Sequence, residues 1–112
     1  MADILDEIVT RKRREVAVAR DRVPLAVLEA ILPKAAPVRD FFAAVAAGPP
    51  MRLIAEFKRQ SPSAGEIRPG ATVADVVRGY AAAGAAAVSV LTDHAGFGGS
   101  LADLEAARAA VS

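Results

Sequence analysis

Two side chains capable of acid–base chemistry, Glu56 and Lys58, stand two positions apart in the segment 53–58. This short apolar run lies between Pro49-Pro50 and Ser61-Pro62-Ser63, which is typical of a buried strand. Alternate residues of a strand share a face, so both charges point the same way. A lysine there can hold an anion or donate a proton, and a glutamate can orient it or accept a proton. The alternative is an ion pair with a structural role, since charges inside a sheet must be paired.

Two loops could complete a site around these charges. The loop predicted for 59–71 contains Ser61-Pro62-Ser63. This sequence is either an ordinary turn signal or a rigid loop segment that covers a bound ligand. The glycine-rich loop 93–99 lacks the spacing of the dinucleotide-binding and Walker motifs, so we do not expect phosphate binding there. Phe97 in that loop is better suited to contact an aromatic ligand. His94 has no base partner beside it in the sequence and is expected to be solvated.

The elements that must position these residues alternate between strand and helix. Thr72 is predicted to cap a helix over 73–83, and a second buried strand is predicted over 86–92. Ser100 is expected to cap a last helix, with Asp103 as the acid of a capping box. Two apolar strands joined by a helix imply a parallel pair, and the functional loops then leave the carboxyl ends of the strands.

The strand faces follow from the alternation of side chains. Leu53, Ala55 and Phe57 are expected to face the covering helices. Ile54 is expected on the other face, together with Glu56 and Lys58. No helix is predicted to cover that face, and Val88 and Val90 of the second strand are expected to lie near it.

The first fifty residues read as short helices and connectors without a catalytic constellation. Helices are predicted over 3–20, over 25–31 after Pro24, and over 41–47 after Asp40, with Gly48-Pro49-Pro50 as the stop. The run Arg11-Lys12-Arg13-Arg14 could be a nucleic-acid-binding arm. We favour a solvated helix face, because acidic residues lie nearby and no aromatic residues interleave for base stacking.

Composition restricts the remaining classes of function. The 112 residues are 54% hydrophobic, carry a net charge of +1 and include no cysteine and one histidine. Disulfides and thiolate metal sites are therefore excluded, and a metal site is not expected. The near-neutral charge gives no general attraction to nucleic acid or to a membrane. No signal peptide or spanning segment is evident, so we expect a cytoplasmic α/β protein.

The most distinctive stretches are Leu-Ile-Ala-Glu-Phe-Lys-Arg-Gln-Ser-Pro-Ser (53–63), Ile67-Arg68-Pro69, Ala-Gly-Ala-Ala-Ala-Val-Ser-Val-Leu-Thr-Asp (83–93) and Phe-Gly-Gly-Ser (97–100). Together they resemble the indole-3-glycerol phosphate synthase family. Ile-Leu-Asp-Glu-Ile-Val (4–9) and Lys-Arg-Arg-Glu-Val (12–16) are similar to that family's helical extension. The likeness runs through nearly all 112 residues, with small departures at Gln60 and Ala95-Gly96.

The resemblance implies an α/β fold, a partial (β/α)8 TIM barrel with an N-terminal helical extension. Residues 1–50 would form the extension and residues 51–112 the first two β/α units. The implied activity is that of a carboxy-lyase of tryptophan biosynthesis, which needs no cofactor. It converts 1-(2-carboxyphenylamino)-1-deoxyribulose 5-phosphate into indole-3-glycerol phosphate, with loss of CO₂ and water. The implied catalytic residues are Glu56 and Lys58, and the implied substrate-binding residues are Ser61, Pro62, Ser89, Leu91 and Phe97.

A complete barrel of this kind runs to about 250 residues. The sequence is therefore expected to be the N-terminal part of such an enzyme, inactive alone. A different phosphosugar barrel, phosphoribosylanthranilate isomerase, would require a cysteine that is absent here. The alternative of another class is a non-catalytic, self-associating β/α module. Two strands leave two open edges, so we expect the chain to self-associate or to pair with the missing part of the barrel.

Overall fold

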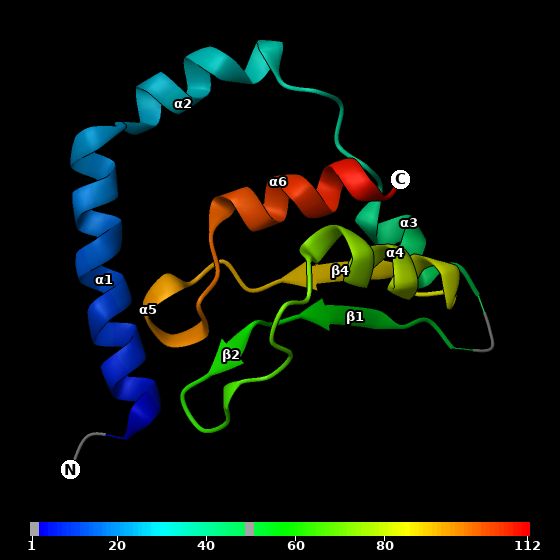
Figure 1. The fold of residues 1–112 in the computed structure, drawn as a ribbon. Helices are drawn as coiled ribbons and strands as arrows, with labels where there is room; N and C mark the ends of the chain where they lie inside the picture. The colour runs from blue at the N-terminus through cyan, green and yellow to red at the C-terminus, as the bar shows by residue number, and fades with distance from the viewer. Residues whose placement is uncertain (1–2, 49–50) are drawn as a thin grey trace. The chain divides into compact units, whose positions relative to one another are not determined.

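A computed structural model describes residues 3–48 and 51–112 of the chain (Figure 1). The chain divides into two compact units, with the boundary between Arg39 and Asp40. The stop predicted at Pro49-Pro50 lies outside the described residues. None of the helices in the described part of the chain is long and apolar enough to cross a membrane.

The first unit consists of helices that bury little. Helix α1 (Ile4–Arg22) begins at Asp3, whose side chain accepts a hydrogen bond from the N–H of Asp6 at 2.9 Å. Helix α2 (Leu25–Ile31) has the predicted bounds, and a 3₁₀ turn, η1 (Leu32–Lys34), follows it. None of these described helical residues is buried. The first helix runs two residues beyond the predicted end. Its last turn contains Arg20 and Arg22, and positive charges there stabilise the helix because its carboxyl end carries the negative end of the dipole.

The second unit is built on the predicted parallel strand pair. Strand β1 (Ile54–Phe57) pairs with strand β4 (Ala87–Val90), and Glu56 lies directly opposite Ser89. Helix α3 (Phe41–Ala46) precedes them, and the side chain of its cap Asp40 accepts a hydrogen bond from the N–H of Ala43 at 2.8 Å. The predicted cap is therefore confirmed, although the helix ends one residue early.

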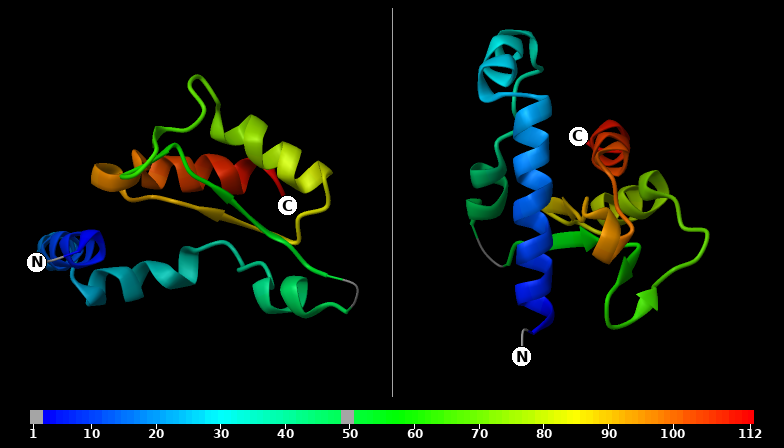
Figure 2. Two further views of the ribbon diagram at one scale, coloured as in Figure 1. Left: turned by 90° about the horizontal axis from the view of Figure 1, so that it is seen from below. Right: turned by 90° about the vertical axis from the view of Figure 1, so that its left-hand side faces the viewer.

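Two helices cover one face of this sheet, as Figure 2 shows. Helix α4 (Val73–Ala82) connects the two strands, and helix α6 (Leu101–Ala110) follows β4. Their hydroxyl caps are as predicted, since Thr72 accepts from the N–H of Asp75 and Ser100 from the N–H of Asp103.

The core lies between these helices and the sheet. Its buried members are Phe57, Val73, Val77 and Ala107. Val88 and Val90 pack against this core, so their predicted place near the open face is wrong. The register explains the difference: Val90 pairs with the buried Phe57, and Ser89 takes the opposite face with Glu56.

The two predicted loops contain short elements that periodicity does not reveal. Strands β2 (Gln60–Ser61) and β3 (Gly65–Glu66) form an antiparallel hairpin. Gly65 has a φ of 64°, in the left-handed region that suits glycine in a tight turn. A one-turn helix, α5 (His94–Phe97), replaces the start of the glycine-rich loop and ends at Gly98.

Candidate active site

The predicted acid–base pair lies on the sheet face opposite the core. The Lys58 Nζ is 3.8 Å from Oε1 of Glu56. The other carboxylate oxygen, Oε2, accepts a hydrogen bond from the Ser89 hydroxyl at 3.1 Å. Glu56 thus contacts Lys58, which directly follows β1, and Ser89 on the facing strand.

An aromatic ring from the next loop completes this group. Phe97, the last residue of α5, has its ring centroid 5.7 Å from the Lys58 Nζ. A cation over a ring face at this distance is attracted by the ring quadrupole. The ammonium therefore has a carboxylate on one side and an aromatic ring nearby. Four residues from three separate segments of the chain thus meet near the carboxyl ends of the two parallel strands.

The solvent exposure of the charges bears on their role. The side chains of Lys58 and Glu56 are 34% and 47% exposed. Ion pairs this open to water contribute about 0–1 kcal/mol to stability. The structural explanation required charges buried in the sheet, and these two are not. In the described chain, both charged groups are therefore accessible to a ligand.

The backbone under Glu56 is fixed from the helix side. Tyr80 of α4 donates a hydrogen bond from its hydroxyl to the carbonyl oxygen of Glu56 at 2.9 Å. Tyr80 also packs against the buried core. Its hydroxyl adds an anchor for the strand at the position of the candidate catalytic carboxylate.

Leu91 follows β4, and its N–H donates to the carbonyl of Phe57 at 3.1 Å. The carbonyl oxygen of Leu91 lies close to Gly99, in the segment that follows α5. A Cβ placed on Gly99 would be 2.0 Å from the Leu91 oxygen. This close approach requires glycine at position 99, so the second loop is held tightly against the end of the strand.

Ser61 and Pro62 belong to the β2–β3 hairpin. The Ser61 hydroxyl accepts a hydrogen bond from the N–H of Ala64 at 3.0 Å, so it stabilises the turn. Pro62 is exposed. No contact described for these residues joins them to the Glu56–Lys58 pair, and their predicted substrate-binding role stays a prediction.

A pocket of about 450 Å³ adjoins the end of β1. It combines Glu56 and Lys58 with residues of the hairpin and of α4. Arg68 is among its lining residues and brings a further positive charge. Ser89, Leu91 and Phe97 do not line it, so the pocket and the group around Phe97 share only the central pair. His94 is exposed, as expected. No group of three potential metal ligands occurs among residues 3–48 and 51–112.

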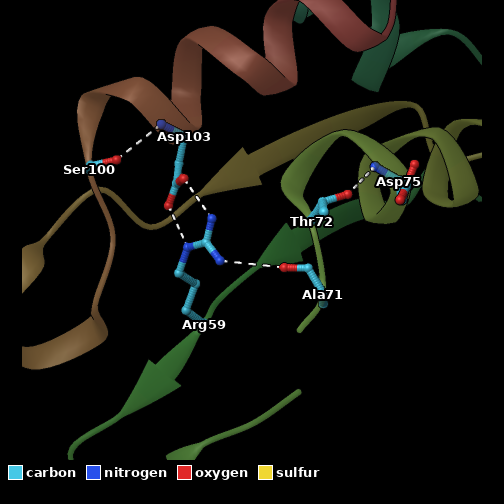
Figure 3. A network of polar contacts seen from close by, with 6 residues as sticks. All are labelled: Arg59, Ala71, Thr72, Asp75, Ser100 and Asp103. Atoms are coloured by element: carbon cyan, nitrogen blue, oxygen red, sulfur yellow. Dashed lines mark hydrogen bonds and ion pairs between the residues drawn. The ribbon is translucent and has the colours of Figure 1, made fainter. Parts of the chain in front are cut away.

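A second polar network lies beside the site and was not indicated by the sequence (Figure 3). Arg59 donates two hydrogen bonds to the carboxylate of Asp103, each at 2.8 Å. Arg59 also donates to the carbonyl of Ala71 at 3.4 Å. The capping-box expectation for Asp103 is thus only half right, because its N–H is bonded to Ser100 while its carboxylate binds Arg59.

Electrostatics agree with this geometry. The hydrogen bonds from Arg59 hold the pKa of Asp103 below its ordinary value, against an opposing effect of burial. The same bonds raise the pKa of Arg59. The partners are 44 positions apart, and no local pattern links them; only the fold brings them together.

Comparison with known proteins identifies the family that this chain matches. The family model described as "Indole-3-glycerol phosphate synthase" matches residues 5–112. A protein named indole-3-glycerol phosphate synthase from Hyphomonas neptunium is 47% identical over 115 residues, covering 100% of this chain and 43% of the relative. Proteins of the same name from Burkholderia multivorans and Saccharopolyspora erythraea are 49% and 44% identical, covering 98% and 97% of this chain and 43% and 40% of those relatives. The chain therefore spans less than half of the length of these curated relatives.

Proposed function

The chain belongs to the indole-3-glycerol phosphate synthase family, and we propose that it supplies part of the active site for the reaction that the family name describes. The family fold is a (β/α)8 barrel, and β1–α4 and β4–α6 are two β/α units of a partial barrel of this kind, preceded by helices. We place the helical extension in residues 1–50. By family the enzyme is a carboxy-lyase, and the proposed substrate is 1-(2-carboxyphenylamino)-1-deoxyribulose 5-phosphate.

The observation that supports this proposal most strongly is the convergence of Glu56, Lys58, Ser89 and Phe97 at one end of the strand pair. In a barrel of this type, the active site lies at the carboxyl ends of the strands. The partly exposed ammonium can take the carboxylate of the substrate. The nearby Phe97 ring can lie against the aromatic ring that bears this carboxylate.

The chemistry requires an acid at this place. During ring closure, the aromatic carbon bearing the carboxylate bonds to the ketone carbon of the sugar chain, and the ketone oxygen takes up a proton. The carboxylate then leaves as CO₂, which restores the aromatic ring. The new hydroxyl takes up a proton and leaves as water, and the adjacent carbon bonded to nitrogen loses a proton to form the double bond of the indole. Lys58 is proposed to hold the carboxylate and to take part in this acid catalysis, while Glu56 orients the ammonium. No cofactor is proposed.

The remaining residues are proposed to contact the substrate in the complete barrel, although they do not line the 450 Å³ pocket of the described chain. Ser61 and Pro62 would do so from the hairpin, and Leu91 would face the barrel interior beside Ser89. The phosphosugar part of the substrate extends beyond the described group, so we propose that phosphate contacts come from other parts of the complete barrel. The expected cytoplasmic location belongs with this proposal.

The open sheet suggests how the barrel is completed. The described sheet has only the two strands β1 and β4, so each has one unpaired edge. Ile54 on the face of Glu56 is 53% exposed, and Leu53 just before the strand is 59% exposed. Unpaired edges recruit other strands, and apolar faces favour burial. We propose that these edges pair with the further strands of a barrel; pairing between copies of the chain is the other way to close them.

One experiment tests the function. The chain is joined to the complementary part of the Hyphomonas neptunium relative, and indole-3-glycerol phosphate formation is measured by its fluorescence. The control is the same complementary part alone, with the chain added separately in a second sample. Activity that needs both parts supports the proposal. A folded, cooperatively melting joined protein with no activity would contradict it, and sedimentation of the chain alone then tests the alternative of a self-associating module.

A further inference from the structure

Arg59 and Asp103 join the end of β1 to the first turn of α6 (Figure 3). The contact is bidentate: Nε and Nη2 of Arg59 each donate to a different carboxylate oxygen at 2.8 Å. The two parallel N–H groups of the planar guanidinium fork fix both the distance and the relative orientation of the two side chains. A single contact between two point charges fixes only the distance. The pair therefore adds a directional contact between these two elements to the packing of α6 on the core.

Burial distinguishes this pair from other ion pairs of the second unit. The Asp103 side chain is 12% exposed, whereas that of Asp75, which pairs with Arg78 at 3.4 Å, is 77% exposed. Both aspartates occupy the same position in the first turn of a helix, with the N–H bonded to a hydroxyl cap. A buried carboxylate that loses its partner is costly, so the Arg59–Asp103 contact is held firmly while the exposed pair is not.

The pair is connected to both partners of the Lys58–Phe97 contact. On one side, Arg59 follows Lys58 directly, and its guanidinium lies 5.3 Å from the centroid of the buried Phe57 ring. On the other side, the N–H of Asp103 is bonded to Ser100, which follows Phe97 after two glycines. Fixing Arg59 to Asp103 thus fixes the backbone that carries the ammonium and the backbone that carries the ring.

We infer that Arg59 and Asp103 are positioning residues that hold Lys58 in place relative to Phe97 and Glu56. Neither side chain needs to touch substrate for this role. The inference rests on the proposed function of Lys58 as a group that acts on the substrate, and it adds residues to which the sequence pattern assigned no such role. A displacement of about 1 Å at a reacting group can lower a rate by about a hundredfold, so a bidentate contact that holds the neighbouring residue can control turnover.

Kinetics of the joined protein test this role. Asp103→Asn keeps the shape of the side chain and removes its charge, and Arg59→Lys keeps the charge and removes the fork. Each change is expected to lower kcat by about tenfold to a hundredfold with a much smaller change in KM, because an orienting contact is lost. The double variant should lose no more than the worse single variant, since both remove one contact.

The matched control is Asp75→Asn, which removes a carboxylate from the equivalent position of α4 and should leave kcat unchanged. Asp103→Glu retains the charge and should recover part of the kcat that Asp103→Asn loses. If Asp103→Asn does not fold, the kcat of Asp103→Glu, compared with that of the parent, takes its place as the test. Circular dichroism establishes that each variant is folded at the assay temperature. An unchanged kcat in Asp103→Asn, or losses that multiply in the double variant, would overturn the inference.

A second readout does not depend on activity. The chain has three lysines, at positions 12, 34 and 58. Brief acetylation followed by peptide mass spectrometry gives the reactivity of Lys58 relative to Lys34 in the same sample. Asp103→Asn should raise this ratio several-fold, and Asp75→Asn should not change it. If the joined protein without substitutions is inactive, the proposed function fails, but the Lys58-to-Lys34 reactivity ratio still tests the positioning role. The same ratio in the parent, Asp103→Asn and Asp75→Asn would contradict that role.

Discussion

The Ser89 hydroxyl donates a hydrogen bond to the carboxylate of Glu56 across the β1–β4 pair, at 3.1 Å. The two residues are directly opposite in the parallel register. One oxygen of the carboxylate is occupied by Ser89, and the other faces Lys58 at 3.8 Å. The strand pairing therefore places the Ser89 hydroxyl beside the Glu56 carboxylate.

Removing this hydroxyl should weaken catalysis without unfolding the protein. Ser89→Ala in the joined protein loses one hydrogen bond, worth about 1 kcal/mol, which corresponds to about fivefold in kcat/KM. Ser89→Thr keeps the hydroxyl and should retain most of the activity. Steady-state kinetics of both variants provide the check; equal activity in Ser89→Ala and the parent would show that Glu56 needs no such partner.

Gly99 should tolerate no side chain. A Cβ there would lie 2.0 Å from the carbonyl oxygen of Leu91, and backbone on both sides prevents an easy shift. Gly99→Ala is expected to lower the free energy of unfolding by about 1–3 kcal/mol or more. The control is Gly79→Ala, within α4, where a Cβ meets nothing within 4 Å and alanine favours the helix. Urea denaturation of both variants tests this, and similar midpoints would refute the close approach.

The local parts of this fold could be predicted from sequence because their causes are local. The caps at Asp40, Thr72 and Ser100 and the bounds of α2 follow from hydroxyl, carboxylate and proline positions within a few residues. The parallel pair followed from two apolar runs separated by one helix. The candidate pair Glu56 and Lys58 followed from the two-residue period of a strand.

The remaining features depend on tertiary geometry. The β2–β3 hairpin has two residues in each strand and α5 has one turn, so neither is long enough to show a period. The faces of Val88 and Val90 depend on register, and a one-residue shift exchanges the two faces. The Arg59–Asp103 contact spans 44 positions, so only the tertiary packing of α6 against α4 and β4 brings the two residues together.

Acid should destabilise the protein partly through Asp103. Its pKa is lowered in the folded state from the ordinary value of 3.8 by hydrogen bonds from Arg59. A group with a depressed folded pKa contributes stability that is present above the unfolded pKa and is lost as pH falls through the folded pKa. The melting temperature of the parent should therefore fall below about pH 4 more steeply than that of Asp103→Asn. Parallel curves for the parent and Asp103→Asn from pH 2 to 6 would contradict this.

The basic run of α1 should not be a nucleic-acid site. Arg11 and Lys12 both form ion pairs with Glu15, and Arg13 and Arg14 are exposed. Any binding to DNA or RNA should be weak and should disappear between about 50 and 200 mM salt, as expected for contacts with phosphates alone. Fluorescence anisotropy with labelled oligonucleotides measures it. Tight binding that persists at high salt, and that is lost in Arg13→Gln/Arg14→Gln, would show that this face has a specific partner.

The measurement that tests the account most directly is the kcat/KM of Lys58 variants in the joined protein. Lys58→Ala removes the ammonium beside Glu56 and Phe97, and the loss of a charge contact in the assembled site should cost about 2–4 kcal/mol, roughly 30-fold to 1,000-fold. Lys58→Arg should not restore the activity, because the guanidinium is larger and retains its proton. Circular dichroism should show both variants folded, since the exposed pair contributes little stability. Such losses in folded proteins are the predicted result; turnover close to that of the parent in either variant would contradict the assignment of Lys58 and leave the ion pair without a catalytic role.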